Sequence, residues 1–233
     1  MDHVYENSHY VPIFCNLMGK KVVVVGGGRV AERKVLSLLP SGAKVTVISP
    51  ELTECLEGLA GKAEIEHLKR PFSQGDLKGA WLVIAATDDS KVQEQVFLEA
   101  ERRGCFCNVV DRPERCSFIV PSVVKRGALT IAISTGGQSP GLARALRIEL
   151  EKEFPRQWAL YVELVGMLRR LILESGSDDA GQRLERLIRL ECIDWIREKE
   201  WEKLKEWAIE LGGKRAENLV KQAISSWTDS SSN

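Results

Sequence analysis

The chain has 233 residues, of which 44% are hydrophobic and 28% charged, and its 33 basic side chains balance 33 acidic ones. These fractions exclude a mainly disordered chain, and the balanced charge argues against a broad nucleic-acid surface. No apolar run reaches the roughly 18 residues of a membrane-spanning helix, and the polar start lacks a signal-peptide pattern, so we expect a cytoplasmic protein with no membrane partner.

The first half of the chain alternates between short apolar segments and helical ones. The expected strands are residues 21–25, 44–48, 64–68, 81–86, 105–110 and 128–134. Helices are expected at residues 29–39 and 91–103. Near-continuous apolar strands that alternate with helices predict an α/β fold, in which helices cover both faces of a parallel sheet.

The second half is predicted to be helical, because strand signals stop at Pro155. Ser139 and Pro140 are typical of a helix start, as N-cap and first helical residue, and this helix is expected to end near residue 154. Further helices are expected at residues 158–174, 182–197 and 198–211, followed by a stop at Gly212-Gly213 and a frayed serine-rich tail at 225–233.

A glycine-rich turn directly follows the first expected strand. Gly26-Gly27-Gly28-Arg29-Val30-Ala31 fits the pattern G-x-G-x-x-A at a strand-to-helix junction. The glycines allow phosphate to approach the backbone, and the helix N-terminus presents free N–H groups to it. The motif predicts a Rossmann-type dinucleotide site with four binding residues in this turn: Gly26, Gly28, Arg29 and Val30. A glycine turn with a purely structural role is the alternative.

The end of the second expected strand lacks the acidic residue that usually binds a ribose. Ser49 stands there instead, and Glu51 follows two residues later. A serine can bond a ribose hydroxyl and a glutamate disfavours a 2′-phosphate, so the sequence favours NAD over NADP. The cofactor-binding residues expected at this strand end are Ser49, Pro50, Glu51 and Leu52.

Two further strand ends carry polar residues at the sheet edge where ligands bind. Thr87 follows the fourth strand and is expected to contact the cofactor, although Thr87-Asp88-Asp89 can equally cap the next helix. Asp111 follows the fifth strand, where its carboxylate can either move a proton or cap its own turn.

Positive charge is concentrated in one segment. Residues 112–147 hold six basic side chains and one acidic one, which favours a compact anionic ligand. A second glycine-rich turn at residues 135–139 lies in this segment, beside Arg144 and Arg147. It can hold carboxylates or phosphates at a helix N-terminus, or serve as a plain connector.

Cysteine and histidine do not predict a metal site. The six cysteines are expected to be reduced thiols, and Cys105 and Cys107 share one face of the fifth strand. A metal would need more ligands nearby. We expect no catalytic role for the three histidines, which are His3, His9 and His67.

Six motifs occur in an order and spacing that together resemble the siroheme synthase family, which joins precorrin-2 dehydrogenase and sirohydrochlorin ferrochelatase activities. They begin at Tyr10, Gly26, Ala85, Cys107, Ser117 and Gly136 and read YVPIFC, GGGRVAERK, AATDD, CNVVD, SFIVP and GGQSP. The resemblance covers residues 8–155, and the helical remainder is similar to the family more loosely. The methyltransferase module of some members is not expected in this chain.

The resemblance implies that NAD⁺ accepts a hydride from precorrin-2 to give sirohydrochlorin, with Asp111 as general base. Insertion of Fe²⁺ in the same cleft, giving sirohaem, is implied for bifunctional relatives and stays open here, because some relatives of this length lack useful chelatase activity. The tetrapyrrole substrates carry many carboxylates, which suits the basic segment. The residues expected to bind substrate are Asn108, Arg112, Arg115, Ser117, Thr135, Gly136, Gly137, Ser139 and Arg144.

The family also implies a homodimer. The expected division is an NAD-binding domain at 1–113, a central dimerisation and substrate segment at 114–154 and a helical C-terminal domain at 155–233. In some relatives the residues before Gly-Gly are Ser-Ser, and the second serine is a phosphorylation site. This chain has Ser134-Thr135 at that place, so regulation by phosphorylation stays open. The competing hypothesis is an NAD-sensing regulatory module that acts through its helical tail, but such a module needs neither the basic segment nor the second glycine-rich turn.

Overall fold

The structure, a computed structural model, describes residues 10–230. The chain forms two compact units that join between Val120 and Pro121. The finer division into three segments, which the sequence suggests, stays a prediction.

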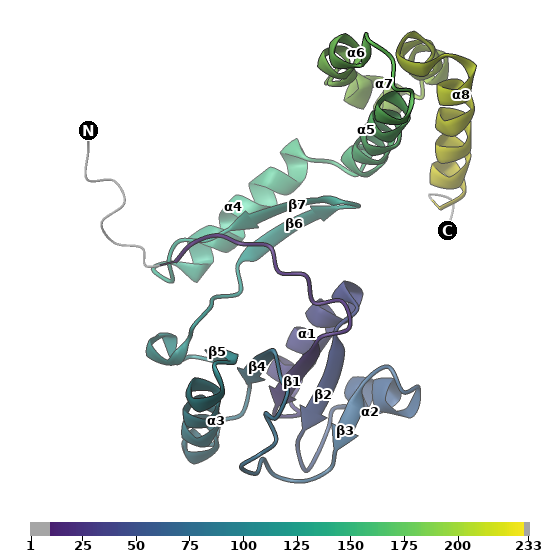
Figure 1. The fold of residues 1–233 in the computed structure, drawn as a ribbon. Helices are drawn as coiled ribbons and strands as arrows, with labels where there is room; N and C mark the ends of the chain where they lie inside the picture. The colour runs from purple at the N-terminus through teal and green to yellow at the C-terminus, as the bar shows by residue number, and fades with distance from the viewer. Residues whose placement is uncertain (1–9, 231–233) are drawn as a thin grey trace. The chain divides into compact units, whose positions relative to one another are not determined.

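The first unit is built on a parallel sheet of five strands in the order β3-β2-β1-β4-β5 (Figure 1). The strands are β1 (Lys21–Val25), β2 (Lys44–Ile48), β3 (Glu66–Leu68), β4 (Leu82–Ala85) and β5 (Phe106–Val109). β1 and β4 are almost wholly buried, as expected for strands that are covered on both faces. The predicted α/β fold with a parallel sheet is therefore confirmed.

Helices cover both faces of this sheet. Alternate residues of β1 point to opposite faces, so Val24 packs with α1 (Arg29–Leu38) and α2 (Glu54–Gly61), whereas Val23 packs with α3 (Ser90–Arg103). The sequence analysis did not predict α2, which contains two glycines and is short. Two 3₁₀ turns, η1 (Leu39–Ser41) and η2 (Pro113–Arg115), complete the unit.

The order of the strands places the candidate residues at one edge. The chain runs outward from β1 through β2 to β3 and then returns to β4, on the other side of β1. The direction in which successive strands are added to the sheet thus reverses between β1 and β4. Open α/β sheets bind ligands at such a point, beside the carboxyl ends of the strands. The turn after β1, Ser49 after β2 and Thr87 after β4 all lie at that edge.

The expected sixth strand does not join the parallel sheet. It is β7 (Leu129–Ile133), and it pairs antiparallel with β6 (Ser122–Arg126), which the sequence analysis missed. Only Gly127 and Ala128 separate the paired ends, and Gly127 has a φ of +58°. A connection of two residues makes a hairpin, because a parallel crossover needs a dozen residues or more.

The rest of the second unit is helical, as predicted. Ser139 caps α4 (Pro140–Glu153) by accepting a hydrogen bond from the N–H of Leu142. A separate core, which includes Leu164, Trp207 and Leu211, joins the four helices that follow. These helices are α5 (Gln157–Glu174), α6 (Ala180–Leu187), α7 (Cys192–Glu198) and α8 (Trp201–Ser230).

Two expectations for these helices are wrong. The helix expected at 182–197 is broken between α6 and α7, where Ile188 adopts an extended conformation. The tail is not frayed over residues 225–230, because α8 continues there and Ile224 and Trp227 pack on the core. Gly212 and Gly213 do interrupt the helix as predicted, since both have non-helical backbone angles.

Candidate functional site

The glycine-rich turn packs between the segments that follow β2 and β4, the two strands on either side of β1. The N–H of Gly26 donates to the carbonyl of Ile48 at 2.9 Å. A Cβ atom at Gly26 would lie 2.1 Å from the carbonyl oxygen of Ala86, and one at Gly27 would lie 1.9 Å from that of Glu51. A Cβ atom at Gly28 would meet nothing within 4 Å. Gly26 and Gly27 are therefore needed for packing within the chain, whereas Gly28 borders open space.

This open space lies at the N-terminus of α1. Gly28 is the N-cap residue and supplies no side-chain cap. The first N–H groups of a helix have no partner within the helix, and they carry a partial positive charge. A phosphate group fits such a terminus, so the turn fits the pyrophosphate of a dinucleotide.

The loop after β2, residues 49–53, packs directly against this turn. The N–H of Thr53 donates to the carbonyl of Gly27 at 3.0 Å, and the Nε2 atom of His67 lies 2.9 Å from the carbonyl oxygen of Ser49. Glu51 is exposed. His67 thus has a structural contact, whereas His3 and His9 lie outside the described residues. The sequence analysis missed Thr53, whose position before Glu54 at the start of α2 was its only signal.

Thr87 lies at the same edge, after β4. Asp89, and not Thr87, caps α3 by accepting hydrogen bonds from the N–H groups of Lys91 and Val92. The Nε2 atom of Gln93, which is buried, donates to the carbonyl of Thr87 at 2.7 Å. Gln93 thereby holds the backbone of Thr87 at the strand end.

Asp111 occupies a tight turn at the end of β5. The N–H of Arg112 donates to the carbonyl of Val109 at 3.1 Å, and Asp111 has a φ of +60°. Few residues other than glycine adopt such an angle, although aspartate and asparagine do so more often than most. The carboxylate is exposed, and within the described residues it accepts no hydrogen bond. Asp111 does not cap its own turn, and its carboxylate is available for chemistry.

Lys34 brings a positive charge from α1 towards this turn. Its ammonium group interacts electrostatically with Asp111 and with Cys116. Burial lowers the pKa of Lys34 and Arg33 lowers it further, whereas Cys116 and Asp111 raise it. The sequence analysis did not select Lys34, because nothing in a helix sequence says which strand end a side chain approaches.

The four substrate residues expected in the first unit differ in their availability. Asn108 donates through Nδ2 to the carbonyl of Phe118 at 3.0 Å, and the hydroxyl of Ser117 accepts a hydrogen bond from the N–H of Cys107 at 2.8 Å. Arg115 forms an ion pair with Glu94. Arg112 is exposed and lies 3.9 Å from Glu114. Arg112 thus has the longest of these contacts, an ion pair between two exposed side chains, and the substrate role of all four stays a prediction.

The second glycine-rich turn lies in the second unit. The hydroxyl of Thr135 accepts a hydrogen bond from the N–H of Ser139 at 3.0 Å. Gly136 and Gly137 have φ values of +63° and +86°, so the turn depends on their lack of side chains. Arg144 is exposed on the first turns of α4. The loop is held in one shape by its own hydrogen bonds, and a role in substrate binding stays a prediction.

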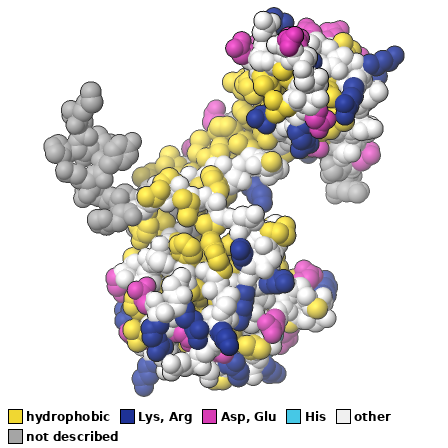
Figure 2. Space-filling view, viewed as in Figure 1, with side chains coloured by type: hydrophobic (Ala, Val, Ile, Leu, Met, Phe, Trp, Pro, Cys, Tyr) yellow, Lys and Arg dark blue, Asp and Glu magenta, His cyan; other side chains and the backbone are white. Residues whose placement is uncertain are grey.

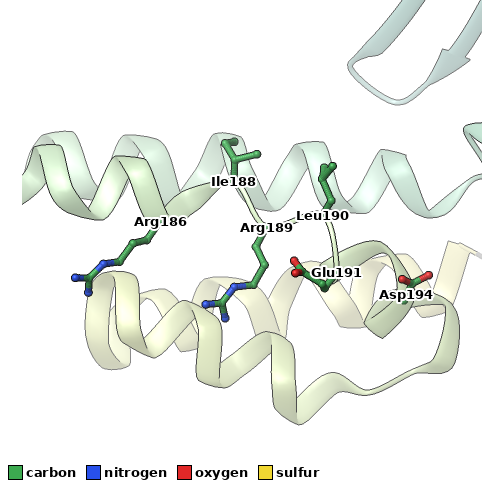
Figure 3. A pocket seen from close by; sticks show the side chains of 6 residues that line it. All are labelled: Arg186, Ile188, Arg189, Leu190, Glu191 and Asp194. Atoms are coloured by element: carbon green, nitrogen blue, oxygen red, sulfur yellow. The ribbon is translucent and has the colours of Figure 1, made fainter.

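A surface depression of about 670 Å³ lies elsewhere in the second unit, at the junction of α6 and α7 (Figure 3). It is lined by Arg186, Ile188, Arg189, Leu190, Glu191 and Asp194. None of these residues was predicted to be functional. The depression is open, and its guanidinium groups lie on a different part of the chain from the glycine-rich turns.

The described residues contain no group of three or more histidine, cysteine or acidic side chains that could hold a metal ion. All six cysteines are free, and Cys105 and Cys107 pack in the same core, as predicted for one strand face. Separately, no helix in the described part of the chain is long and apolar enough to cross a membrane.

The buried thiols predict a loss of stability at high pH. Burial raises the pKa of Cys105 from 9.0 to about 11, and the pKa values of Cys107 and Cys192 to about 12. The folded state therefore binds these protons more tightly than the unfolded state. We expect the free energy of unfolding to be unaffected by these groups below pH 9 and to fall between pH 9 and 12. Urea titrations at several pH values would measure this.

A matched variant isolates this effect. The triple variant Cys105→Ala/Cys107→Ala/Cys192→Ala should show a shallower loss of stability in the same pH range. Cys55→Ala, which removes an exposed thiol, should behave as the unmodified chain. Equal slopes in all three proteins would contradict the assignment of the loss to buried thiols.

Comparisons with known proteins agree with these features. Residues 13–122 match a family model described as NAD(P)-binding, and residues 126–153 match the model "Sirohaem biosynthesis protein central". Siroheme synthase 3 of Aeromonas hydrophila is 47% identical over 163 residues, which are 70% of this chain and 35% of that protein. Siroheme synthase 2 of the same organism is 39% identical over 219 residues, which are 92% of this chain and 46% of that protein.

The structural comparison supports the fold. A solved structure titled "SirC, precorrin-2 dehydrogenase" matches with a TM-score of 0.71 and 24% identity, over 81% of this chain and 96% of that one. This chain spans between about a third and a half of the curated relatives it matches in sequence. Together with the two family models, these relatives show that the chain, through its residues 13–153, belongs to the siroheme synthase family.

Proposed function

We propose that the protein is an NAD-dependent dehydrogenase that oxidises precorrin-2 to sirohydrochlorin in siroheme biosynthesis. The observation that carries the proposal is the exposed carboxylate of Asp111, which lies at the same sheet edge as the glycine-rich turn. Two strand spacings separate β5 from β1, or roughly 10 Å. A dinucleotide whose pyrophosphate lies at α1 can extend over that distance.

The sheet edge suggests how the two halves of the cofactor would lie. With the pyrophosphate at Gly28, one half would extend over the loop after β2, where Ser49, Pro50, Glu51 and Leu52 stand, and the other over Thr87 towards Asp111. Glu51 is exposed and would repel the 2′-phosphate of NADP, so NAD is the proposed cofactor. When bound, NAD⁺ supplies the hydride acceptor.

Asp111 would act as the general base. Oxidation of precorrin-2 removes a hydride and a proton and leaves one new double bond. The proton goes to a carboxylate oxygen of Asp111, which is available because it accepts no hydrogen bond from the described chain. Arg112 and Arg144 are exposed cations that suit the carboxylates of the tetrapyrrole.

We propose Fe²⁺ as a second substrate, to be inserted into sirohydrochlorin at the same site. The support is again the exposed carboxylate of Asp111, which can accept one of the two pyrrole protons that leave as the metal enters, while the other passes to solvent. Such a step needs no resident metal cluster, and the described residues contain none.

An anaerobic assay tests both activities. Purified protein is mixed with precorrin-2 and NAD⁺, and NADH and the tetrapyrrole spectrum are followed before and after Fe²⁺ is added. NADH formation supports the dehydrogenase, and metal insertion above the uncatalysed rate supports the chelatase. If the protein binds NAD⁺ but forms no NADH with intact substrate, the dehydrogenase proposal fails and the regulatory hypothesis replaces it.

We also propose that the protein is a homodimer. The second unit exposes apolar side chains on its hairpin and on α4, namely Val123, Leu142, Leu146 and Ile148, and Figure 2 shows hydrophobic side chains in that part of the unit. Exposed apolar surface of this kind is typical of an interface between copies.

Sedimentation velocity tests this proposal. The unmodified chain should sediment as a dimer at micromolar concentration, and Leu142→Glu/Leu146→Glu should shift it towards the monomer, because it places charges in the apolar surface. Leu173→Glu, on an exposed apolar side chain of α5, is the matched control and should remain dimeric. A monomeric unmodified chain would refute the dimer.

A further inference from the structure

The loop after β2 is tied to the first turns of two helices by one threonine. The hydroxyl of Thr53 donates to the Oε2 atom of Glu32, on α1, and the two atoms are 2.5 Å apart. The same hydroxyl accepts a hydrogen bond from the N–H of Leu56, so that it also caps α2. The N–H of Thr53 donates to the carbonyl of Gly27. Thr53 therefore joins the glycine-rich turn, α1 and α2.

This link bears directly on the space for a cofactor. The carbonyl of Glu51 lies so close to Gly27 that no Cβ atom fits between them. Any outward movement of residues 49–53 would separate this contact and change the shape of the turn. A loop that is not held in place samples many conformations. Ordering it when the cofactor binds costs conformational entropy, and this cost weakens the affinity for the cofactor.

The carboxylate of Glu32 is well suited to hold the loop. It lies in the first turn of α1, where the helix dipole favours a negative charge. A hydrogen bond from a hydroxyl to a carboxylate is stronger than one between neutral groups. Glu32 is also only partly exposed, which limits competition from water.

We propose that Glu32 and Thr53 are positioning residues, which hold the loop at residues 49–53 in the conformation that binds the dinucleotide. This inference rests on the proposed NAD site and adds two residues to it. Neither residue is expected to touch the reacting atoms. Their effect should therefore appear in the affinity for NAD⁺, measured without substrate.

Isothermal titration of the full chain with NAD⁺ tests the proposal. Glu32→Ala and Thr53→Val should each raise the dissociation constant about tenfold, since each removes the same charge-assisted hydrogen bond. The double variant should bind about as weakly as Thr53→Val alone, because Glu32 has no bond to Thr53 left to lose; Thr53→Val also removes the cap on the N–H of Leu56. Thermal melts followed by circular dichroism establish that each variant is folded.

Conservative variants separate positioning from a general loss of structure. Glu32→Gln keeps an oxygen that accepts from Thr53, and Thr53→Ser keeps the hydroxyl, so both should bind NAD⁺ within about threefold of the unmodified chain. Glu66→Ala is the matched control, because Glu66 accepts a hydrogen bond from the hydroxyl of Thr46 at 2.8 Å. It breaks the same kind of threonine–glutamate pair in the same unit, away from the loop at residues 49–53, and should leave NAD⁺ affinity unchanged.

The outcomes distinguish this inference from the proposed function. Unchanged affinity in Glu32→Ala, or equal losses in Glu32→Ala and Glu66→Ala, would overturn the positioning role even if the enzyme is an active dehydrogenase. The expected pattern would stand even if precorrin-2 is not oxidised, because the titration contains no substrate. An unmodified chain that binds no dinucleotide would overturn both.

Discussion

Asp111→Asn is expected to lower the rate of NADH formation from precorrin-2 at least about 100-fold, the usual effect of removing a general base. The protein should stay folded, because asparagine tolerates the φ of +60° as well as aspartate does. Its affinity for NAD⁺ should change less than about twofold, since the carboxylate is proposed to lie at the far end of the site. The anaerobic assay and the NAD⁺ titration measure these two quantities separately.

The control for this variant is Asp88→Asn. Asp88 is also an exposed carboxylate at a strand end of the same sheet edge, and its replacement should leave the rate unchanged. A rate above a third of the unmodified value in Asp111→Asn would show that the proton goes elsewhere. A similar loss in Asp88→Asn would show that charge at this edge, and not the base, is what the reaction needs.

The turn of Asp111 allows a second variant. Asp111→Gly should abolish NADH formation like Asp111→Asn, but it should also raise the free energy of unfolding by up to about 1 kcal/mol, because glycine adopts positive φ without strain. Urea unfolding measures this gain. If Asp111 is kept for function despite its strained backbone, its replacement by glycine should stabilise the chain and abolish activity.

Gly27→Ala is expected to destabilise the chain strongly, whereas Gly28→Ala is expected to leave its stability nearly unchanged. A Cβ atom at position 27 would lie 1.9 Å from the carbonyl oxygen of Glu51, so the loop at residues 49–53 must move. We expect a loss of several kcal/mol in stability, in the range of overpacked sites, together with NAD⁺ affinity at least about 30-fold weaker. A Cβ atom at position 28 meets nothing, so stability should change by less than about 1 kcal/mol.

Gly28→Ala should nevertheless weaken NAD⁺ binding. The open space beside Gly28 is where the pyrophosphate is proposed to lie, and a methyl group there would hold it away from the N–H groups of α1. We expect about a tenfold loss, with an unchanged urea midpoint. Gly58→Ala, in α2 and away from the turn, is the control and should affect neither quantity much. Normal NAD⁺ affinity in Gly28→Ala would place the cofactor elsewhere.

Several features were predictable from the sequence because their causes are local. The β-branched run at residues 21–25, the three glycines and the following helix form a strand, turn and helix that local backbone preferences favour. Ser139 and Pro140 mark the start of α4 for the same reason. The apolar strands that alternate with helices predicted a parallel sheet, because only burial on both faces explains such runs.

Other features depended on contacts between distant residues. The segment at 129–133 has the composition of a buried parallel strand, and only its pairing with β6 made it part of a hairpin. The break between α6 and α7 lies inside a sequence with helical spacing. The helical tail is polar and serine-rich, and its packing on the core of the second unit outweighs that weak preference.

The sequence by itself therefore determined the class of fold and the family. It also identified the glycine-rich turn and Asp111 as candidate site residues, since all of these follow from local backbone preferences and from motifs. Only the tertiary structure decided that Gly27 packs on Glu51, that Lys34 interacts electrostatically with Asp111 and that Thr53 joins Glu32. These pairs are separated by 20 residues or more along the chain in each case. Which distant side chains meet depends on strand order and on helix packing, and no local pattern of residues specifies either one.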